Sequence, residues 1–336
     1  MEQQDWARVV AAATRAPSIH NTQPWRFVAG PDRLELHLDE TRALPVLDPS
    51  GRQQVISCGI ALEFAVVALA AAGEGTEVEL LPGAGALGSV RLTGPVADTE
   101  EVRSLATAIE RRHTVRTPFA ARAVPDGLLD RLQAEAGAFD TWLKPITRSE
   151  EEVATVFLIS RAEEIEQGDP AYLAELESWL RTDPAAEDGV PLAAVPEGDP
   201  HERASNWLIR DFVAGQREAH TFLAAGNPDA PPPAVERPAV VLMGTDGDDR
   251  TAWLSAGRAL GRVLLRLTEE GLVASPLTQA LDWPATRTRM QSRLSLVGYP
   301  QMLLRLGYPP ERPDAAPPVV SGRRPVEDVL RFEPAG

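Results

Sequence analysis

The feature that most constrains this chain is a repeat within its own sequence. When residues 55–73 are laid over residues 253–271, an offset of 198, six of 19 positions are identical. In both copies an Asp-containing turn precedes a helical pattern and a glycine ends it. We predict two related halves whose repeated helices closely approach each other, or an equivalent neighbour, at small residues. Chance agreement between two Ala/Leu-rich helices is the alternative.

The remaining patterns predict an α+β protein. Helices are expected at about 5–15, 52–72, 99–112, 151–167, 171–181 and 250–270, with another from about 125; strands are expected at 25–28, 33–38, 77–81, 89–92, 141–144, 239–243 and 300–306. We expect the first half to span residues 1–97 and the second half residues 98–336. Pro- and Gly-rich turns at about 182–238 indicate a lid-like insertion, with Trp179 and Trp207 as candidate anchors.

Composition limits the function to small-molecule chemistry. The 336 residues include 33 Lys and Arg against 49 Asp and Glu, a net charge of −16, which argues against nucleic acid or an anionic membrane as partner. The single cysteine, Cys58, excludes an internal disulfide, and the five histidines show no zinc-ligand spacing, so we expect no metal. The first 15 residues lack a signal-peptide pattern, and the apolar run 60–72 is too short to span a bilayer. We therefore expect a cytoplasmic protein.

A polar loop at residues 16–27 is the first candidate site. Ser18, Asn21 and Gln23 lie in it between two prolines. Asn and Gln carry both donors and acceptors, so they can recognise the carbonyl and imide edge of a heteroaromatic ring. The flanking prolines limit how much order the loop must acquire on binding. The alternative is structural, with Ser18 and Asn21 only satisfying the helix end and the turn.

Two arginine clusters are candidates for an anion site. Arg112 and Arg116 flank Thr114 where a helix gives way to a loop, and Arg323 and Arg324 lie in the Pro-rich tail. Arginine offers paired donors in a fixed geometry, which suits a phosphate. The alternatives are a solvated helix end for the first cluster and surface charge balance for the second.

The segment 271–279 follows the second repeat helix and reads as strand-like. It contains Ser275, Pro276 and Leu277, among small residues that would let the backbone approach a flat ligand. An ordinary helix-to-strand connection is the alternative. No Ser-His-Asp or metal constellation occurs in the chain.

Together these motifs resemble the nitroreductase family of FMN-dependent oxidoreductases. The most specific match is Pro-Ser-x-x-Asn-x-Gln-Pro-Trp at 17–25, followed by Arg-x-Thr-x-Arg at 112–116. Ordinary members carry the Arg motif first, whereas here it follows the loop by about 90 residues, and neither motif has an evident second copy. The arrangement is similar to the actinobacterial Acg-type branch. That resemblance implies a nitroreductase-like fold with two fused halves that mimic a dimer, one FMN and a lid.

The resemblance also implies residue roles. Arg112, Thr114 and Arg116 would bind the phosphate, ribityl chain or pyrimidine edge, and Arg323 with Arg324 would close on the phosphate. The residues expected beside the isoalloxazine ring are Ser18, Asn21, Gln23, Ser275, Pro276 and Leu277. His20 replaces a smaller residue common in the family, and we interpret it as packed or capped rather than reaching the flavin.

Two functions remain open at this stage. In the first, FMN accepts hydride from NADPH or NADH and passes it to a nitroaromatic- or quinone-type acceptor, so the chemistry lies on the cofactor. In the second, the insertion covers the flavin and the protein stores or sequesters FMN. A third reading, a structural protein without flavin, would require that added FMN fail to bind. Partners would be small molecules only, and the fused halves allow a monomer.

Overall fold

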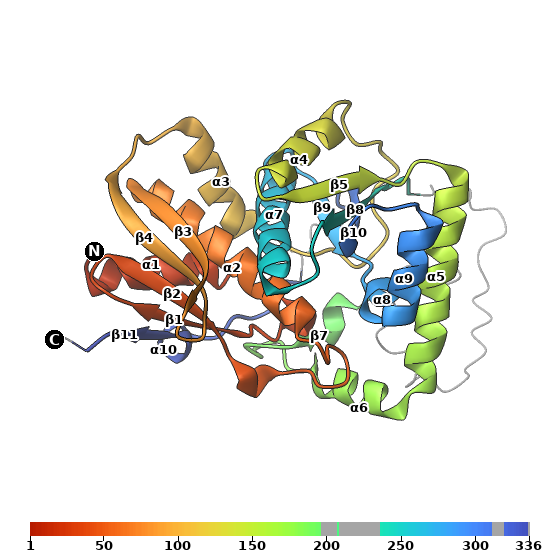
Figure 1. The fold of residues 1–336 in the computed structure, drawn as a ribbon, viewed down its shortest axis with the longest axis horizontal. Helices are drawn as coiled ribbons and strands as arrows, with labels where there is room; N and C mark the ends of the chain where they lie inside the picture. Colours follow the sequence, from red (N-terminus) through yellow and green to blue (C-terminus); the bar gives the residue numbers. More distant parts are fainter. Residues whose placement is uncertain (196–206, 208–235, 311–318, 335–336) are drawn as a thin grey trace.

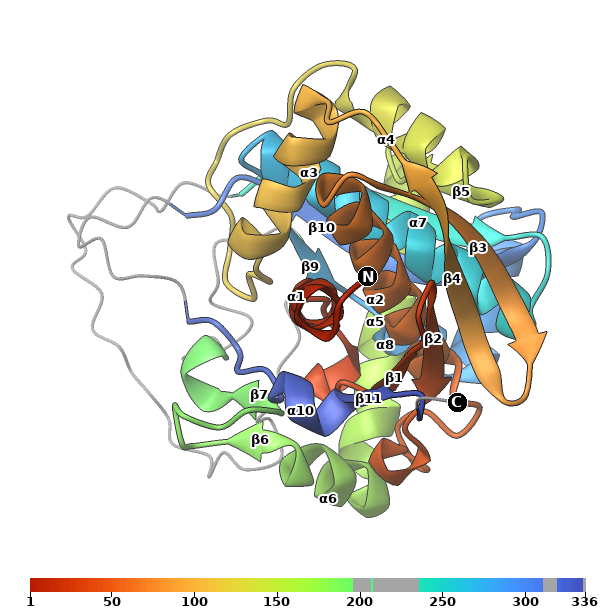
Figure 2. The ribbon, with the colours of Figure 1, turned by 90° about the vertical axis from the view of Figure 1, so that its left-hand side faces the viewer.

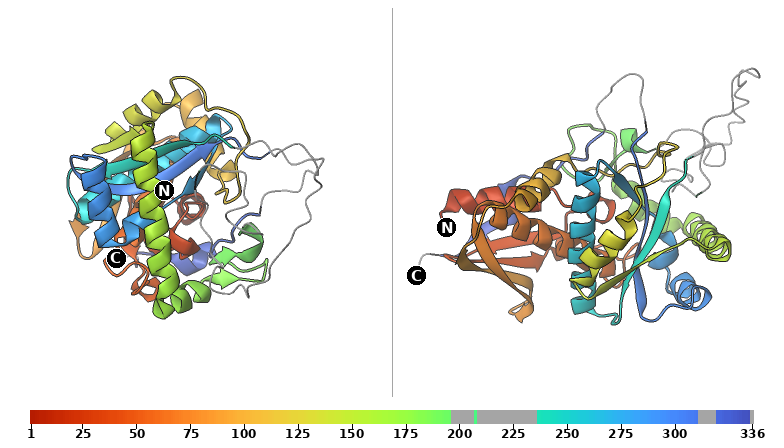
Figure 3. Two further views of the ribbon diagram at one scale, coloured as in Figure 1. Left: turned by 90° about the vertical axis from the view of Figure 1, so that its right-hand side faces the viewer. Right: turned by 90° about the horizontal axis from the view of Figure 1, so that it is seen from above.

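The computed structural model describes residues 1–195, 207, 236–310 and 319–334. Two sheets form separate layers, and the long helices α2 and α7 pack against each other between them (Figure 1). The view from above separates the N-terminal sheet from the second sheet on either side of these helices (Figure 3). The mixed α+β class predicted from the sequence is confirmed.

The first half is built around the sheet order β1-β2-β4-β3, with every neighbouring pair antiparallel. Its elements in chain order are α1 (Gln3–Ala13), η1 (Ile19–Asn21), β1 (Trp25–Ala29), β2 (Arg33–Leu38), η2 (Glu40–Arg42), α2 (Arg52–Ala71), β3 (Glu74–Gly83) and β4 (Ala86–Pro95). The β3–β4 hairpin is longer than the predicted strands at 77–81 and 89–92.

The second half repeats this topology. Its elements that correspond to those of the first half are α4 (Leu128–Gly137), β5 (Thr141–Pro145), β8 (Ala239–Thr245), α7 (Arg250–Glu269), β9 (Val273–Pro276) and β10 (Tyr299–Gly307). The sheet order is β5-β8-β10-β9, again antiparallel throughout. Each strand therefore occupies the place of its counterpart, and α2 and α7 begin 198 residues apart, the offset of the sequence repeat.

The halves differ in what is inserted between these elements. Helix α3 (Glu100–Arg111) links them; α5 (Ser149–Gly168), α6 (Pro170–Ser178), β6 (Leu180–Arg181), β7 (Val190–Pro191) and η3 (Leu192–Ala194) follow β5; α8 (Gln279–Asp282) and α9 (Pro284–Arg293) follow β9. The sequence analysis did not predict α8 and α9. Most of the insertion predicted at 182–238 lies outside the described residues. Trp207 is described, and it is buried in a hydrophobic cluster that includes Leu158 of α5 and Leu281 of α8.

Matched glycines allow α2 and α7 to cross closely. A Cβ atom on Gly59 would lie 2.9 Å from the Gly257 Cα atom, and one on Gly257 would lie 2.8 Å from the Gly59 Cα atom and closer still to the Ile56 carbonyl. These two glycines are one of the identical pairs of the repeat. The predicted close approach of the repeated helices is therefore confirmed, and it occurs between the helices themselves.

The ends of the two helices also correspond. Gly73 follows α2 with φ 85°, and Gly271 follows α7 with φ 72°, a left-handed conformation that glycine adopts without a Cβ penalty. At the start of α7, Asp249 accepts a hydrogen bond from the Ala252 amide at 2.9 Å. At the start of α2, Asp48 accepts one from the Gln54 amide at 2.9 Å. The N-cap of α7 is Asp249 and that of α2 is Gly51, three residues after Asp48, and both helices have 20 residues.

The C-terminal segment crosses back to the first half. After α10 (Val326–Val329), strand β11 (Leu330–Phe332) pairs in parallel with β1 and extends the first sheet, as Figure 2 shows at its dark blue end. No strand was predicted in this tail. The division at residue 97 stays a prediction, and the final strand of residues 98–336 lies in the sheet of the first half.

Helix α2 meets the length and apolarity needed to cross a membrane, alone among the helices of the described ranges. It is nevertheless the core helix, in contact with α1, α3 and α7, and its residues Ile56, Leu62 and Phe64 are fully buried. The apolar run 60–72 is thus the second part of a longer helix that is largely buried in this fold.

Candidate functional site

A cleft opens where the two halves meet. Its floor consists of apolar side chains from α2 (Ile56 and Ile60) and from α7 (Leu260 and Leu264). Strands β9 and β10 and the loops at 17–20 and 112–116 form its walls, and Val190 closes one side. Residues of α2 and of α7, β9 and β10 thus line one cleft.

One end of the cleft is positively charged. Arg112, Arg116 and Arg323 line the cleft or the recess that adjoins it, and no acidic side chain is among the lining residues in the described part of the chain. Burial, and then the charges of Arg323, Arg15 and Arg116, lower the pKa of Arg112 to about 9. Burial, and then Arg15, lowers the pKa of Arg323 to about 10. Arg112 and Arg323 therefore lie close together without a carboxylate partner among the described residues.

These guanidinium groups retain hydrogen-bonding capacity. The Nε atoms of Arg112 and Arg323 are buried without a hydrogen-bond partner among the described residues. Arg323 otherwise donates to carbonyl oxygens of Arg15, Ala16, Ser321 and Gly322, at 2.8 to 3.3 Å. Buried donors without partners cost free energy, and an anion would satisfy both the donors and the charge.

The predicted site residues fall into three groups. Ser18, Arg112, Thr114, Arg116, Ser275 and Pro276 line the cleft. Asn21 and Arg323 line the adjoining recess. Gln23, Leu277 and Arg324 line neither of them.

The side chains of the third group are engaged elsewhere. Gln23 is fully buried and donates to the Glu187 carbonyl at 2.8 Å. Arg324 pairs with Asp39 at 3.3 Å. The Leu277 amide donates to the Leu303 carbonyl at 2.9 Å. The predicted flavin contacts of these three residues stay predictions.

The loop at 17–24 is held in an unusual backbone conformation. The φ angles of His20, Asn21 and Gln23 are 44°, 55° and 51°. They lie in the left-handed region, which residues other than glycine rarely adopt. Ser18 Oγ accepts from the Gln23 amide at 2.9 Å, and Ser57 Oγ on α2 accepts from the Ile19 amide at 3.1 Å. Such strain persists only where surrounding contacts determine it, and it is typical of functional sites.

Histidines and the apolar floor complete the site. His20 is buried and lines the cleft together with the more exposed His113. Sequence reasoning did not identify the floor residues, although the repeat marked their helices. The signal that could have found them is the close crossing of α2 and α7, since neighbouring side chains on these helices must share one surface. No group of residues able to hold a metal ion occurs among the described residues.

The chain is similar to known proteins over nearly its whole length, although no family model matches it. It is 34% identical to a Mycobacterium tuberculosis protein, Rv3131, whose name describes an NAD(P)H nitroreductase, over 96% of this chain and 90% of that protein. It is 31% identical to the Acg protein of the same organism, also named as an NAD(P)H nitroreductase, over 96% and 93%. A solved structure of the FMN-dependent nitroreductase NfnB from Mycobacterium smegmatis aligns with a TM-score of 0.35 and 15% identity, over 70% of this chain and 96% of that one.

Proposed function

Because the chain belongs to the family of NAD(P)H nitroreductases, we propose that it binds one FMN in the cleft and passes electrons from NADPH or NADH to an electron-poor acceptor of nitroaromatic or quinone type. The observation that carries the proposal concerns two arginines, the buried Arg112 and the partly buried Arg323. Their Nε donors lack partners among the described residues, and their pKa values are lowered.

The charged end of the cleft suits a phosphate monoester. Such a group carries between one and two negative charges at neutral pH and offers several acceptor oxygens. Arg112 and Arg323 would supply charge-assisted donors from two directions, with Arg116 and Thr114 on the same loop. Binding would offset the cost of holding Arg112 and Arg323 close together without a carboxylate partner among the described residues.

The other end suits a flat aromatic ring. Ile60, Leu260 and Leu264 present an apolar surface from two crossing helices. Burying an aromatic face against such a surface is favourable by about 25 cal/mol per Å² of apolar area. The cleft thus has one end for a ring system and one end for its phosphate, which is the polarity that FMN requires.

A bound FMN would supply the hydride chemistry, so the chain needs no nucleophile or metal of its own. The part left to the protein is binding, orientation and exclusion of water. Arg112 and Arg323 hold the anionic end, the α2–α7 floor holds the ring, and Ser275 on β9 lines one wall.

An anaerobic absorbance titration tests this function. The purified protein is reconstituted with FMN, titrated with NADPH and then NADH, and finally given a quinone or nitroaromatic. Bleaching of the flavin band and its recovery on adding the acceptor would support the oxidoreductase. A stoichiometrically bound flavin that stays oxidised with both donors would favour the alternative, FMN storage. Protein that fails to bind FMN would refute both.

One chain would suffice for the site. The cleft takes side chains from α2 of the first half and from α7, β9 and β10 of the second, so no residue from a second copy is needed. We therefore propose an active monomer. Light scattering during size-exclusion chromatography of the FMN-loaded protein tests this, and activity that depended on protein concentration would contradict it.

A further inference from the structure

Three segments that are far apart in the sequence meet beside the recess. They are residues 18–23 of the first half, residues 186–189 after β6, and residues 322–324 of the tail; together we call them the clasp. Gly322 packs so tightly on the Ala186 carbonyl that a Cβ atom there would also lie 2.8 Å from the Glu187 Cα atom. The tail is therefore pressed against the other segments, with Arg323 on its recess side.

Asn21 joins all three segments. Its Nδ2 atom donates to the Gly189 carbonyl and to the Gly322 carbonyl, each at 3.1 Å. Its Oδ1 atom accepts from Arg323 Nη1, also at 3.1 Å. An asparagine amide has two N–H donors, and both are used here. Asn21 thus has no donor left for the carbonyl edge of a ring.

Gln23 makes the same kind of connection. Its Nε2 atom donates to the Glu187 carbonyl at 2.8 Å, and its Oε1 atom accepts from the Arg324 amide at 2.9 Å. The side chain is fully buried and lies outside the cleft lining. Gln23 therefore holds the tail backbone at Arg324, the residue that follows Arg323.

We propose that Asn21 and Gln23 are positioning residues that hold Arg323 at the anionic end of the cleft, rather than residues that contact the flavin ring. This rests on the proposed function. The left-handed backbone of Asn21 and Gln23 turns their side chains into the clasp at a cost in strain. That cost is explained if the clasp fixes the position of Arg323, which lines the recess.

If Asn21 only positions Arg323, it affects the binding of a ligand solely through the ligand's phosphate. FMN and riboflavin share the ring and ribityl chain and differ only in the phosphate. Removing Arg323, or the contact with Asn21 that positions it, therefore weakens the binding of FMN and leaves the binding of riboflavin unchanged. A residue that touches the ring would instead weaken both ligands by the same factor, and so would a residue needed only for folding.

The experiment measures the Kd of FMN and of riboflavin by fluorescence quenching for the full-length protein and its variants. We expect Asn21→Ala and Arg323→Ala each to weaken FMN about tenfold or more while riboflavin changes by less than about twofold. In the double variant Asn21→Ala/Arg323→Ala, the Kd of FMN should lie within about twofold of that in Arg323→Ala alone, because both changes remove the same interaction. Equal weakening of FMN and riboflavin by Asn21→Ala would overturn the proposal.

Two further variants make the test complete. Asn21→Asp is isosteric and places a carboxylate on Arg323, so it should weaken FMN and spare riboflavin. Arg8→Ala removes one positive charge from an exposed pair with Asp5 on α1 and should leave both affinities unchanged. If neither Asn21 variant folds, as judged by circular dichroism, the clasp serves folding and the proposal fails. Wild-type protein that binds neither flavin would instead refute the proposed function on which it rests.

Discussion

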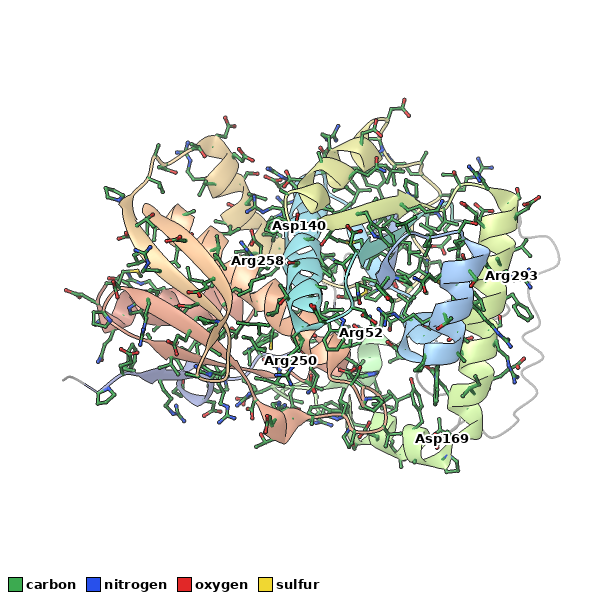
Figure 4. All side chains as sticks on the ribbon, in the orientation of Figure 1. Arg52, Asp140, Asp169, Arg250, Arg258 and Arg293 are labelled. Carbon is green, nitrogen blue, oxygen red and sulfur yellow. The ribbon has the colours of Figure 1, made fainter. Side chains whose placement is uncertain are left out.

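The two halves of the molecule have the same topology, but they differ in the side chains they place where they meet. On one side of the α2–α7 crossing, Ile60 lies on the floor of an open cleft. The residue 198 positions later is Arg258, which pairs with Glu63 at 3.0 Å and lies 4.9 Å from the centre of the Phe139 ring. Figure 4 labels Arg258 beside α7 on the side of the first half. The shared backbone therefore allows two sites, and the side chains leave one of them open.

The filled side depends on an asymmetry within the repeat. Glu63 is fully buried and accepts from both Arg258 and Arg262 of α7, the latter at 2.5 Å. Its counterpart on α7 is Gly261, where a Cβ atom would lie 3.2 Å from the Glu63 Cβ atom. One copy supplies the carboxylate and the other supplies the space and the cations. A duplicated scaffold can thus give up one cleft and gain a buried ionic contact between its halves.

Removing that carboxylate should have the largest effect on stability. Glu63→Gln leaves Arg258 and Arg262 without a negative partner, and breaking a buried ion pair typically costs about 3 to 5 kcal/mol. Urea unfolding measured by circular dichroism gives the free energy. The control is Glu77→Gln, which breaks an exposed pair with Arg91 on β3 and β4 and should cost less than about 1 kcal/mol. Similar costs for the two variants would contradict a special role for the filled side.

A methyl group at the helix crossing should have the next largest effect. Gly257→Ala would place a Cβ atom against the Ile56 carbonyl and the Gly59 Cα atom, backbone groups that cannot rotate away. We expect a loss of about 3 kcal/mol in the free energy of unfolding. Gly137→Ala, at a helical position with nothing within 4 Å, should be neutral or stabilising by up to about 1 kcal/mol. If Gly257→Ala were equally harmless, the crossing would not be the contact that joins the halves.

How much the sequence could predict follows the same division between backbone and side chains. The repeat predicted the helix bounds, the glycine ends and the close crossing, because these depend on local spacing and on residue size. It could not predict β11, since a three-residue strand in a Pro-rich tail forms only where the open edge of β1 accepts it. Helices α8 and α9 were missed because they lie in an insertion between β9 and β10 without a counterpart in the first half.

The candidate site was predictable as a set of motifs and less so as a set of contacts. The motifs brought Ser18, Arg112 and Arg116 to one cleft. They did not separate Arg323 from Arg324, because adjacent residues of an extended tail face opposite ways and the sequence does not show which side faces the recess. Nor did they show that the amides of the loop are used by distant carbonyl groups. Such pairings depend on tertiary contacts made by chain segments that are far apart.

The starts of the two central helices offer a pH-dependent comparison. Burial raises the pKa of Asp48, at the start of α2, to about 6. Because this carboxyl binds its proton more tightly in the folded chain than in the unfolded chain, its contribution to stability is present at low pH and is lost as pH rises from about 4 to 6. We expect Asp48→Asn to match wild type near pH 4 and to be more stable by about 2 kcal/mol at pH 7.

The measurement is the difference in free energy of unfolding between Asp48→Asn and wild type at several pH values from 4 to 7. Other titrating groups cancel in this difference. Asp249→Asn, the exposed cap at the start of α7, keeps an acceptor for the Ala252 amide and should change stability at pH 7 by less than about 0.5 kcal/mol. A difference that shrank as pH rose would show that the Asp48 carboxylate is stabilised by the fold rather than strained by it.

The smallest expected effect separates two neighbouring arginines of the tail that crosses between the halves. Arg323 lines the recess, whereas Arg324 contacts Asp39 and the Gln23 carbonyl in the first half. The sequence motif treats them as one phosphate clamp. Because Arg324 lines neither the cleft nor the recess, we expect Arg324→Ala to weaken FMN binding by less than about 1 kcal/mol. For Arg323→Ala we expect a loss of about 1.5 to 3 kcal/mol, the scale of a hydrogen bond to a charged group. Fluorescence titration with FMN decides between them, and an equal loss in both variants would restore the two-arginine clamp and move the anionic end of the cleft toward the first half.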